Sequence, residues 1–178
     1  MVWCGLAVSS AAVIRHIFIS PGHNFYGRYG QLAGEHPAID VCAGNCRAGC
    51  GIEGDRFYGY RPDYKGQVTF FAWETYEAIK RKFGVPALLP SAFRRNVVVE
   101  GIELNSLIDR RFVLGGVEFE GTGEATPCHW MNSAVAPGAE QWLLGQGGLR
   151  AKILTDGELH VGPVEFFVQA EAAALPLR

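Results

Sequence analysis

Short apolar runs separated by glycine are the feature of this sequence that most limits its fold. The chain has 23 glycines in 178 residues, and they interrupt runs that are rich in β-branched and aromatic residues. Runs of about four to eight such residues between turn signals favour β-strands over long helices. We predict strands at residues 16–19, 38–42, 67–72, 96–100, 111–114, 117–120, 149–154, 158–161 and 164–168.

Two dipeptides between these predicted strands are typical of hairpin turns. Gly115-Gly116 separates one pair of strands, and Asp156-Gly157 separates another. Both dipeptides favour the positive backbone angles that two-residue hairpin loops need. Many short strands with few helices indicate a mainly β fold, either a barrel or a sandwich.

One segment has the periodicity of a helix. Aromatic and apolar residues between Trp73 and Phe83 recur every three or four positions, so they share one helix face, and Gly84 ends the segment. Shorter helices are predicted at 90–95, 126–131 and 139–144.

Length and organisation indicate one domain, because no repeat, linker or low-complexity tract divides the 178 residues. Residues 1–14 are apolar but contain no Lys or Arg, whereas a secretory signal begins with basic residues; a weak signal is the alternative. We therefore predict an N-terminal extension (1–14), a folded domain (15–168) and an Ala-rich C-terminal tail (169–178). No apolar run is long enough to cross a bilayer.

Charge and cysteine content narrow the class of protein. A net charge of -2 gives no reason to expect a nucleic-acid or membrane-surface partner. The five cysteines are an odd number, so they cannot all pair internally, and a disulfide-stapled domain is not expected at this length. A reducing cytoplasm is the plainer expectation for the location.

Cys128, within Thr126-Pro127-Cys128-His129-Trp130, is the strongest candidate for chemistry. Thr126 suits a helix N-cap and Pro127 the first helical position, so the Cys128 sulfur would lie in the first turn of the predicted helix. Free backbone N–H groups and the helix dipole favour a thiolate there. A thiolate can attack a sulfur donor, hold a persulfide or bind a soft metal such as molybdenum. The alternative is an inert, buried cysteine.

Three other segments carry groups suited to anions. Arg94 and Arg95 could clamp a phosphate or carboxylate, or form an ordinary basic pair on the surface. Asp55 could orient Arg56 toward an anion, or the two could lock a loop as a structural ion pair. The glycine-rich segment 145–148 lacks the Lys and Ser/Thr of a phosphate loop, which favours a flexible turn.

Cys42, Cys46 and Cys50 form a local pattern with three residues between successive cysteines. Three thiols could hold an iron–sulfur cluster or, with a fourth ligand, zinc. The spacing matches neither the usual zinc pattern nor the usual cluster pattern, so a redox or metal site is the minor interpretation.

Taken in order along the chain, these segments resemble the MOSC family, and the likeness runs from about residue 16 to residue 163. The resemblance implies that residues 15–168 are a MOSC domain, a closed β-barrel similar to the one inserted in pyruvate kinase, with a few short helices. The motifs that carry it are Gly51-Ile52-Glu53-Gly54-Asp55-Arg56, Gln67-Val68-Thr69, Phe93 to Gly101, Glu120-Gly121-Thr122-Gly123 with Pro127-Cys128, and Gly147 to Ala151.

The resemblance also implies molybdenum-cofactor chemistry with one essential cysteine, matched here by Cys128. In the family's sulfurases this domain binds the molybdenum cofactor (molybdopterin) and accompanies a cysteine desulfurase that uses pyridoxal phosphate. In the amidoxime-reducing branch the matching cysteine ligates molybdenum. Many members carry another Cys or an Arg shortly before the Pro-Cys pair, where this chain has Glu124, Ala125 and Thr126, which leaves the cofactor contacts there open.

Pyridoxal phosphate binding fits a partner desulfurase better than this chain. No Schiff-base lysine is evident, because the lysines lie outside the shared motifs: Lys65, Lys80, Lys82 and Lys152. The expected partners are therefore a cysteine desulfurase or a molybdoenzyme, together with a small anionic cofactor.

Cys128 is thus predicted to be both the catalytic residue and a molybdenum ligand. One hypothesis is a sulfur carrier or a molybdenum-dependent oxidoreductase; the other is a non-catalytic binding module in which Cys128 merely packs. The predicted cofactor-binding residues are Gly54, Asp55, Arg56, Gln67, Arg94, Arg95, Asn96, Gly148 and Arg150.

Overall fold

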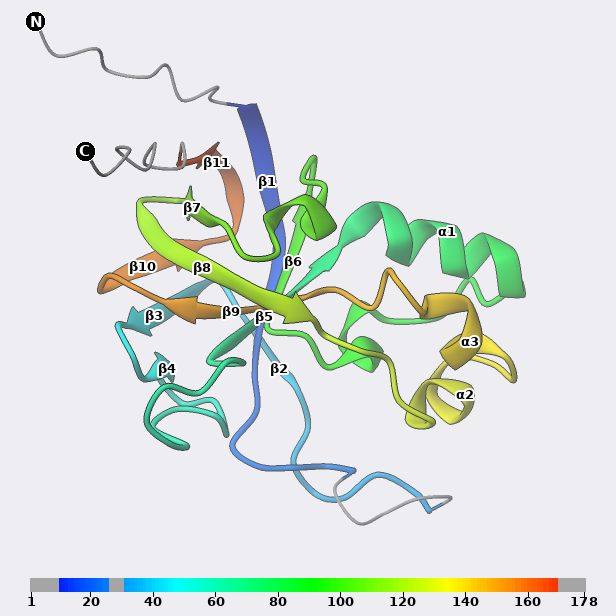
Figure 1. The fold of residues 1–178 in the computed structure, drawn as a ribbon. Helices are drawn as coiled ribbons and strands as arrows, with labels where there is room; N and C mark the ends of the chain where they lie inside the picture. Colours follow the sequence, from blue (N-terminus) through cyan, green and yellow to red (C-terminus); the bar gives the residue numbers. More distant parts are fainter. Residues whose placement is uncertain (1–9, 26–30, 170–178) are drawn as a thin grey trace, which may run out of the picture.

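A closed β-barrel positions every other described element. The computed structural model describes residues 10–25 and 31–169. The strand order β11-β7-β8-β9-β5-β6-β1 closes because β11 pairs with both β7 and β1, and β2 extends the sheet beside β1 (Figure 1). The strands are β1 (Ser10–Ile19), β2 (Ile39–Val41), β5 (Val68–Ala72), β6 (Val97–Glu100), β7 (Arg111–Leu114), β8 (Val117–Glu124), β9 (Leu149–Ile153) and β11 (Gly162–Val168). The mainly β fold and the closed barrel are confirmed.

The barrel interior is filled by the residues that alternate along its strands. Phe112 stacks on Phe119 with ring centroids 5.4 Å apart, and Phe70 meets Phe119 edge to face at 5.3 Å. All three rings are buried, as are Val97 and Val99 of β6. Burial of such large apolar side chains is the main favourable contribution to folding, and it fixes which face of each strand points inward.

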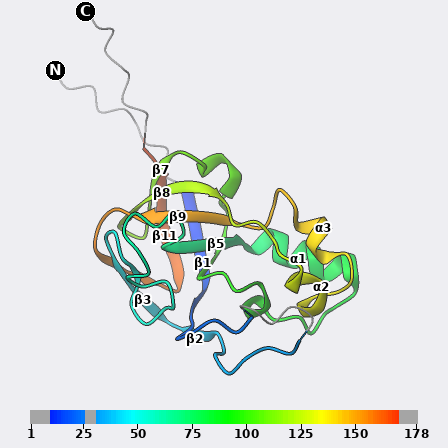
Figure 2. The same cartoon turned by 60° about the horizontal axis from the view of Figure 1, so that its bottom comes forward.

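The helices lie on one side of the barrel and a small sheet on the other (Figures 1 and 2). Helix α1 (Trp73–Phe83) makes the crossover between the parallel strands β5 and β6. A second apolar cluster, which includes Phe71, Phe93 and Met131, joins α1 to the short helices. The remaining elements are η1 (Pro90–Phe93), η2 (Leu104–Leu107), α2 (Trp130–Ala134), α3 (Ala139–Leu143), β3 (Ala43–Arg47), β4 (Gly51–Ile52) and β10 (Gly157–His160).

The N-terminal boundary differs from the prediction. Strand β1 begins at Ser10, six residues before the predicted start at His16, and residues 10–14 pair with β11. Ala12 and Ile14 are buried in the barrel, so these positions belong to the folded sheet and not to an extension. Residues 1–9, which include Cys4, and residues 170–178 of the predicted tail lie outside the described residues.

One of the two predicted hairpins is confirmed and the other is wrong. Strands β7 and β8 pair around Gly115-Gly116 as expected. Strand β10, however, pairs with β3 and not with β9. The turn before it is held by Asp156, whose carboxylate accepts a 2.8 Å hydrogen bond from the Ala48 amide. A pairing partner this distant in sequence leaves no signal in the turn residues themselves.

The predicted helix at 126–131 is also wrong at its start. Helix α2 begins at Trp130 and is capped by His129, so Cys128 precedes the helix. The chain stays extended after β8 because the Ala125 amide donates a 2.8 Å hydrogen bond to the Gly148 carbonyl. The five-residue helix therefore gives no helix-dipole argument for a thiolate at Cys128.

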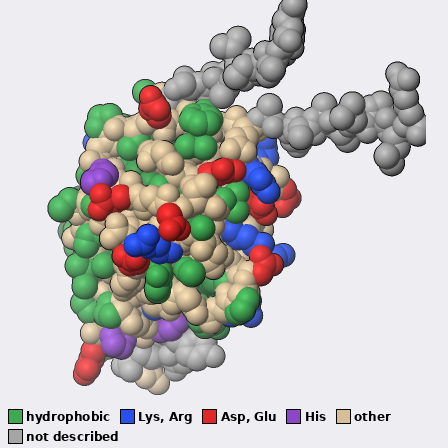
Figure 3. Space-filling model, turned by 90° about the vertical axis from the view of Figure 1, so that its left-hand side faces the viewer, with side chains coloured by type: hydrophobic (Ala, Val, Ile, Leu, Met, Phe, Trp, Pro, Cys, Tyr) green, Lys and Arg blue, Asp and Glu red, His purple; other side chains and the backbone are tan. Residues whose placement is uncertain are grey.

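No helix in the described part of the chain is both long and apolar enough to cross a membrane. On the face shown in Figure 3, the basic and acidic side chains are intermixed, without a broad patch of one sign.

Gly148 gives a direct test of the packing between β9 and β5. It adopts a φ of 107°, and a Cβ placed there would lie 2.1 Å from the Phe70 carbonyl oxygen. We expect Gly148→Ala to lower the free energy of unfolding by more than about 3 kcal/mol, measured by urea denaturation. Gly123→Ala is the matched control, because Gly123 also has a positive φ, 145°, but faces open space. Equal losses in the two variants would contradict the packing described here.

Candidate functional site

A cavity of about 570 Å³ is lined by five of the candidate residues that the sequence singled out. It lies where the segments after β1, β4, η1 and β8 meet. Cys128 lines it together with four arginines, which are Arg56, Arg94, Arg95 and Arg150. These residues are far apart in sequence, and the barrel brings them to one place. The arginines differ in what they contact, and therefore in what they can do.

Cys128 stands in the short irregular segment between β8 and α2. Its side chain is exposed, and its carbonyl accepts a 2.8 Å hydrogen bond from the Met131 amide, which fixes the turn into α2. The Cys128 thiol is therefore not buried. An accessible thiol on the wall of a cationic cavity can reach a bound ligand.

Arg95 holds this segment in place. Its guanidinium donates to three backbone carbonyls: to Gly147 at 2.9 Å through Nε, to Phe93 at 3.2 Å through Nη1, and to Ala125 through Nη2. These carbonyls belong to three separate segments, one of which continues to Cys128. Burial lowers the pKa of Arg95 to about 10. Most of its hydrogen-bonding capacity is spent on the protein, so Arg95 positions the site more than it binds a ligand.

Arg94 faces the cavity from a conformation that is unusual for a residue with a side chain. It caps η1 with a φ of 57°, in the left-handed region. Its guanidinium lies over the Phe25 ring at 4.3 Å, and Phe25 stacks on Trp130 with ring centroids 3.6 Å apart. Burial, followed by the charge of Arg56, lowers the pKa of Arg94 to about 10. The two cations therefore repel each other across the cavity.

Arg56 is oriented by its neighbour in sequence. Asp55 is buried, and its carboxylate accepts hydrogen bonds from the Ser20 amide at 3.1 Å, from the Phe57 amide at 3.1 Å and from Arg56 Nη1 at 3.3 Å. Asp55 thus locks the loop as a structural ion pair and also holds the Arg56 guanidinium, while the binding of an anion by Arg56 stays a prediction. The Arg56 side chain is only 10% exposed.

Two buried nitrogen atoms near this cavity lack hydrogen-bond partners. Over residues 10–25 and 31–169, the buried side-chain nitrogen or oxygen atoms without a partner are Arg56 Nε and Trp130 Nε1. Both residues line the cavity. An unsatisfied buried donor costs about 1–3 kcal/mol and is rare in native proteins, so its presence calls for an explanation. An acceptor brought by a ligand would relieve both.

The other predicted cofactor-binding residues lie behind the cavity and do not line it. Gln67 Oε1 accepts from the Ile153 amide at 2.9 Å, which ties the loop before β5 to β9. The Asn96 amide group links β5 and β1 through Thr69 and the Phe18 carbonyl. Gly54 and Gly148 occupy backbone positions with positive φ.

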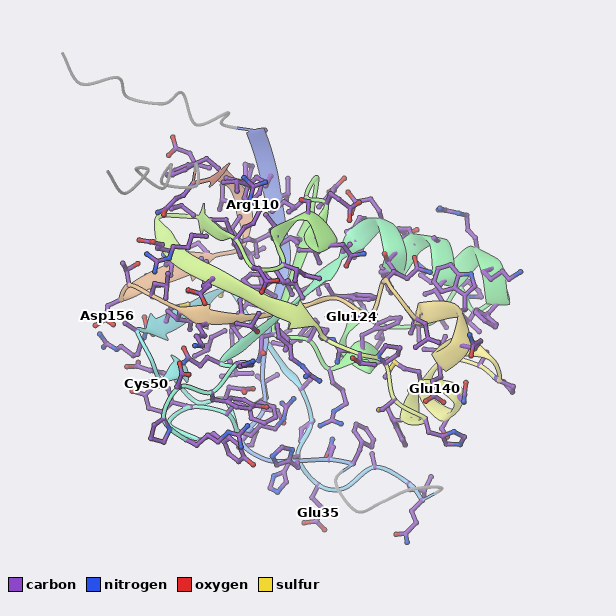
Figure 4. All side chains as sticks on the ribbon, in the orientation of Figure 1. Glu35, Cys50, Arg110, Glu124, Glu140 and Asp156 are labelled. Atoms are coloured by element: carbon purple, nitrogen blue, oxygen red, sulfur yellow. The ribbon has the colours of Figure 1, made fainter. Side chains whose placement is uncertain are left out.

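The glycine segment 145–148 binds a carboxylate of the protein itself. The amides of Gly145 and Gly147 donate to Glu124 Oε1 at 2.9 and 3.1 Å. Figure 4 shows Glu124 at the end of β8, beside this segment. An acid of the chain occupies the donors that a phosphate would need, which agrees with the prediction of a turn and not a phosphate loop.

The cysteine pattern at 42–50 does not form a metal centre in the described residues. No group of three His, Cys, Asp or Glu residues that could hold a metal occurs in the described part of the chain. Cys46 is buried in the barrel, and burial raises its pKa to about 12, whereas Cys42 is exposed. Cys50 lies at the opposite end of the molecule from Glu140 in Figure 4.

The sequence analysis missed the aromatic walls of the cavity. Phe25, Phe57, Tyr64, Phe93 and Trp130 line it, and they come from separate segments. Phe57 and Trp130 follow Arg56 and Cys128-His129 closely in sequence, a signal that could have been used. Phe25 and Tyr64 carry no local signal, because only the fold brings them to the cavity.

His23 adds a titratable group to the same wall. Burial, followed by the charges of Arg56 and Arg94, lowers its pKa. Its ring meets Phe57 edge to face at 5.1 Å. The lowered pKa favours the neutral form of the His23 ring beside the arginines.

A protein-family model and several solved structures are similar to this chain. The family model described as the MOSC domain matches residues 61–164. Among solved structures, the YuaD protein from Bacillus subtilis is similar with a TM-score of 0.71 and 20% identity, over 93% of this chain and 100% of that chain.

Two further structures are similar in fold. YiiM from Geobacillus stearothermophilus has a TM-score of 0.64 and 14% identity, over 92% of this chain and 77% of that chain. YiiM from Escherichia coli has a TM-score of 0.59 and 17% identity, over 89% and 72%. No curated protein sequence matches the chain.

The role of Arg95 can be separated from that of an exposed cavity arginine. We expect Arg95→Lys to lower the free energy of unfolding by about 3 kcal/mol, because the donors of an ammonium group share one nitrogen, which cannot reach carbonyls that three different guanidinium nitrogens now contact. The conservative control Arg150→Lys lies at an exposed position and should change it by less than about 0.5 kcal/mol. Urea denaturation of both variants gives the comparison, and similar small losses would remove the positioning role.

Proposed function

The chain belongs to the MOSC domain family, and from this premise we propose that it binds a molybdenum cofactor and handles sulfur or molybdenum through Cys128. The observation that carries the proposal is the cavity in which Cys128 meets Arg56, Arg94 and Arg150. Arg95 holds the segment that presents the thiol.

Charge supports an anionic ligand. Four arginines line the cavity, and no Asp, Glu or Lys is among its described lining residues. Asp55 pairs with Arg56 from behind the wall. Buried cations without counter-charges are unfavourable, so the cavity gains most from an anion. Guanidinium groups bind phosphate oxygens with good geometry, and Arg56 still has a donor to offer through its unpartnered Nε.

Shape and surface support a planar ligand. Phe57 and Trp130 are among the residues that line the cavity, and aromatic side chains bind planar heterocycles by stacking. A volume of about 570 Å³ suits a molecule of cofactor size. A pterin that carries a phosphate combines both properties, so the residues present fit the molybdenum cofactor.

The chain's own residues would then divide the work. Arg56, Arg94 and Arg150 would hold the phosphate, and the aromatic walls would hold the ring. The Cys128 thiolate is a soft ligand, which suits molybdenum. Molybdenum, when bound, would supply oxidation–reduction chemistry. Arg95 would keep the Cys128 segment in position throughout.

A sulfur-carrier role uses the same thiol. The Cys128 thiolate would attack the outer sulfur of a persulfide on a cysteine desulfurase, and the desulfurase thiolate would leave as the new Cys128 persulfide forms. Pyridoxal phosphate would belong to that partner, because no lysine lines the cavity among the described residues. A cytoplasmic location is part of this proposal, and the free cysteines at positions 42, 46, 50 and 128 agree with it.

The alternative is a non-catalytic module that binds an anionic cofactor or partner. The same arginines favour it, but the exposure of Cys128 does not, because a merely structural cysteine would be packed away. A molybdoenzyme that receives the cofactor is a partner consistent with either function.

Metal and pterin analysis of the protein purified from its native source tests the proposal. We expect molybdenum and pterin to co-purify with the wild type in a fixed ratio. The Cys128→Ser variant should remain folded and contain at least about tenfold less molybdenum than the wild type. Cys42→Ser is the matched control, because Cys42 is also exposed, and it should retain the wild-type content.

Two results would contradict the assignment of Cys128. Full molybdenum content in Cys128→Ser would remove its role as a ligand. Absence of molybdenum from all three proteins, with no persulfide on Cys128 after incubation with a cysteine desulfurase and cysteine, would leave the binding module as the function.

A further inference from the structure

A second cavity adjoins the one that contains Cys128. Its volume is about 420 Å³, which lies within the range of small-molecule pockets, roughly 300–1,000 Å³. It shares five lining residues with the Cys128 cavity but does not include Cys128. The shared residues are Phe25, Arg56, Arg94, Arg95 and Trp130.

The wall that belongs to this second cavity alone is mostly apolar. Phe18 and Ile19 at the end of β1 contribute to it, as do Leu88 and Ala92 before and within η1. The polar groups nearby are largely engaged: Ser20 Oγ donates to the carbonyls of Gly22 and His36. The Asn96 amide group bonds to Thr69 and to the Phe18 carbonyl.

The polar side chains on the wall shared with the Cys128 cavity are donors. Arg56 and Arg94 bring two guanidinium groups to the shared wall, and Trp130 brings an indole N–H that has no partner. No Asp, Glu or Lys occurs among the described residues that line this cavity. A cationic ligand would find no counter-charge, whereas an anion would find two guanidinium groups and a neutral donor.

We propose that this second cavity binds a small molecule that has an apolar body and a carboxylate, beside a cofactor held in the Cys128 cavity. Apolar walls favour the body, and guanidinium groups bind a carboxylate through paired hydrogen bonds. The shared residues place such a molecule next to the first cavity. That this small molecule is a substrate would rest on the proposed function, whereas its binding to the second cavity does not.

Benzoate is the probe, and benzylamine is the control with the same ring and the opposite charge. Isothermal titration calorimetry measures the affinity of the full chain for each compound. The indole N–H resonance of Trp130 in NMR spectra, assigned from its absence in Trp130→Phe, shows whether the compound binds beside Trp130. We expect saturable benzoate binding that shifts this resonance, and no binding of benzylamine.

Two variants separate this cavity from the first one. Ala92→Phe places a larger side chain in the second cavity and should weaken benzoate binding at least about tenfold. The rate at which iodoacetamide alkylates Cys128 should stay the same as in the wild type. Leu144→Phe, at a half-exposed position outside this cavity, should bind benzoate as the wild type does. Trp130→Phe keeps an aromatic ring but loses the donor, and should weaken binding about tenfold.

Wild-type benzoate affinity in Ala92→Phe would overturn the proposal. If that variant does not fold, wild-type affinity in Trp130→Phe would overturn it instead. Equal binding of benzylamine, or benzoate that protects Cys128 equally in the wild type and Ala92→Phe, would also contradict it. If benzoate binds but the purified protein contains no molybdenum, the second cavity is still a binding site for a small carboxylate, and only the role of that molecule as a substrate is removed. Molybdenum without benzoate binding would refute this inference and keep the proposed function.

Discussion

The hydrogen bonds from Arg95 to three backbone carbonyls are the interaction on which the candidate site depends. They join the turn after η1, the segment that leads from β8 to Cys128, and the glycine segment before β9. Strand pairing joins the ends of β8 and β9, where Glu124 pairs with Leu149 and the Ala125 amide donates to the Gly148 carbonyl, but it does not fix the end of η1 beside them. The planar guanidinium of Arg95 can fix these segments relative to one another, because its donors point in several directions. It does this only where the surroundings exclude competing water. The placement of Cys128 is therefore a consequence of a buried arginine.

That arrangement concentrates positive charge that the described residues do not neutralise. Burial lowers the pKa of Arg94 and of Arg95 to about 10, which shows that their charged forms lose solvation at this place. Asp55 offsets part of the charge on Arg56. The unfavourable desolvation of these cations is concentrated at one cavity. The two residues whose buried nitrogen atoms lack partners in the described chain also line this cavity. Such a concentration is expected of a site that is completed by an anionic ligand.

Much of the fold could be predicted from the sequence, but only part of the cavity lining could: Cys128 and the arginines line it, whereas Gln67 and Asn96 do not. The periodicity from Trp73 to Phe83 fixes α1 to the residue, because its apolar face is encoded locally. The start of α2 could not be predicted, because Pro127 resembles a first helical residue while the Gly148 carbonyl, distant in sequence, keeps the chain extended. The family resemblance predicted Cys128 and the arginines. It could not show that Arg95 serves the backbone while Arg94 faces the cavity, since adjacent identical residues differ only through their surroundings.

The central claim is that Cys128 lies in a field of positive charge that attracts anions. The most direct test is to alkylate the protein with iodoacetate and with iodoacetamide, and to compare the rates at each cysteine by mass spectrometry. The two reagents differ mainly in charge, and exposed Cys42 in the same molecule is the internal control. We expect a higher ratio of iodoacetate to iodoacetamide rates at Cys128 than at Cys42, and we expect this difference to shrink in high salt. Equal ratios at the two cysteines, at low salt, would contradict it.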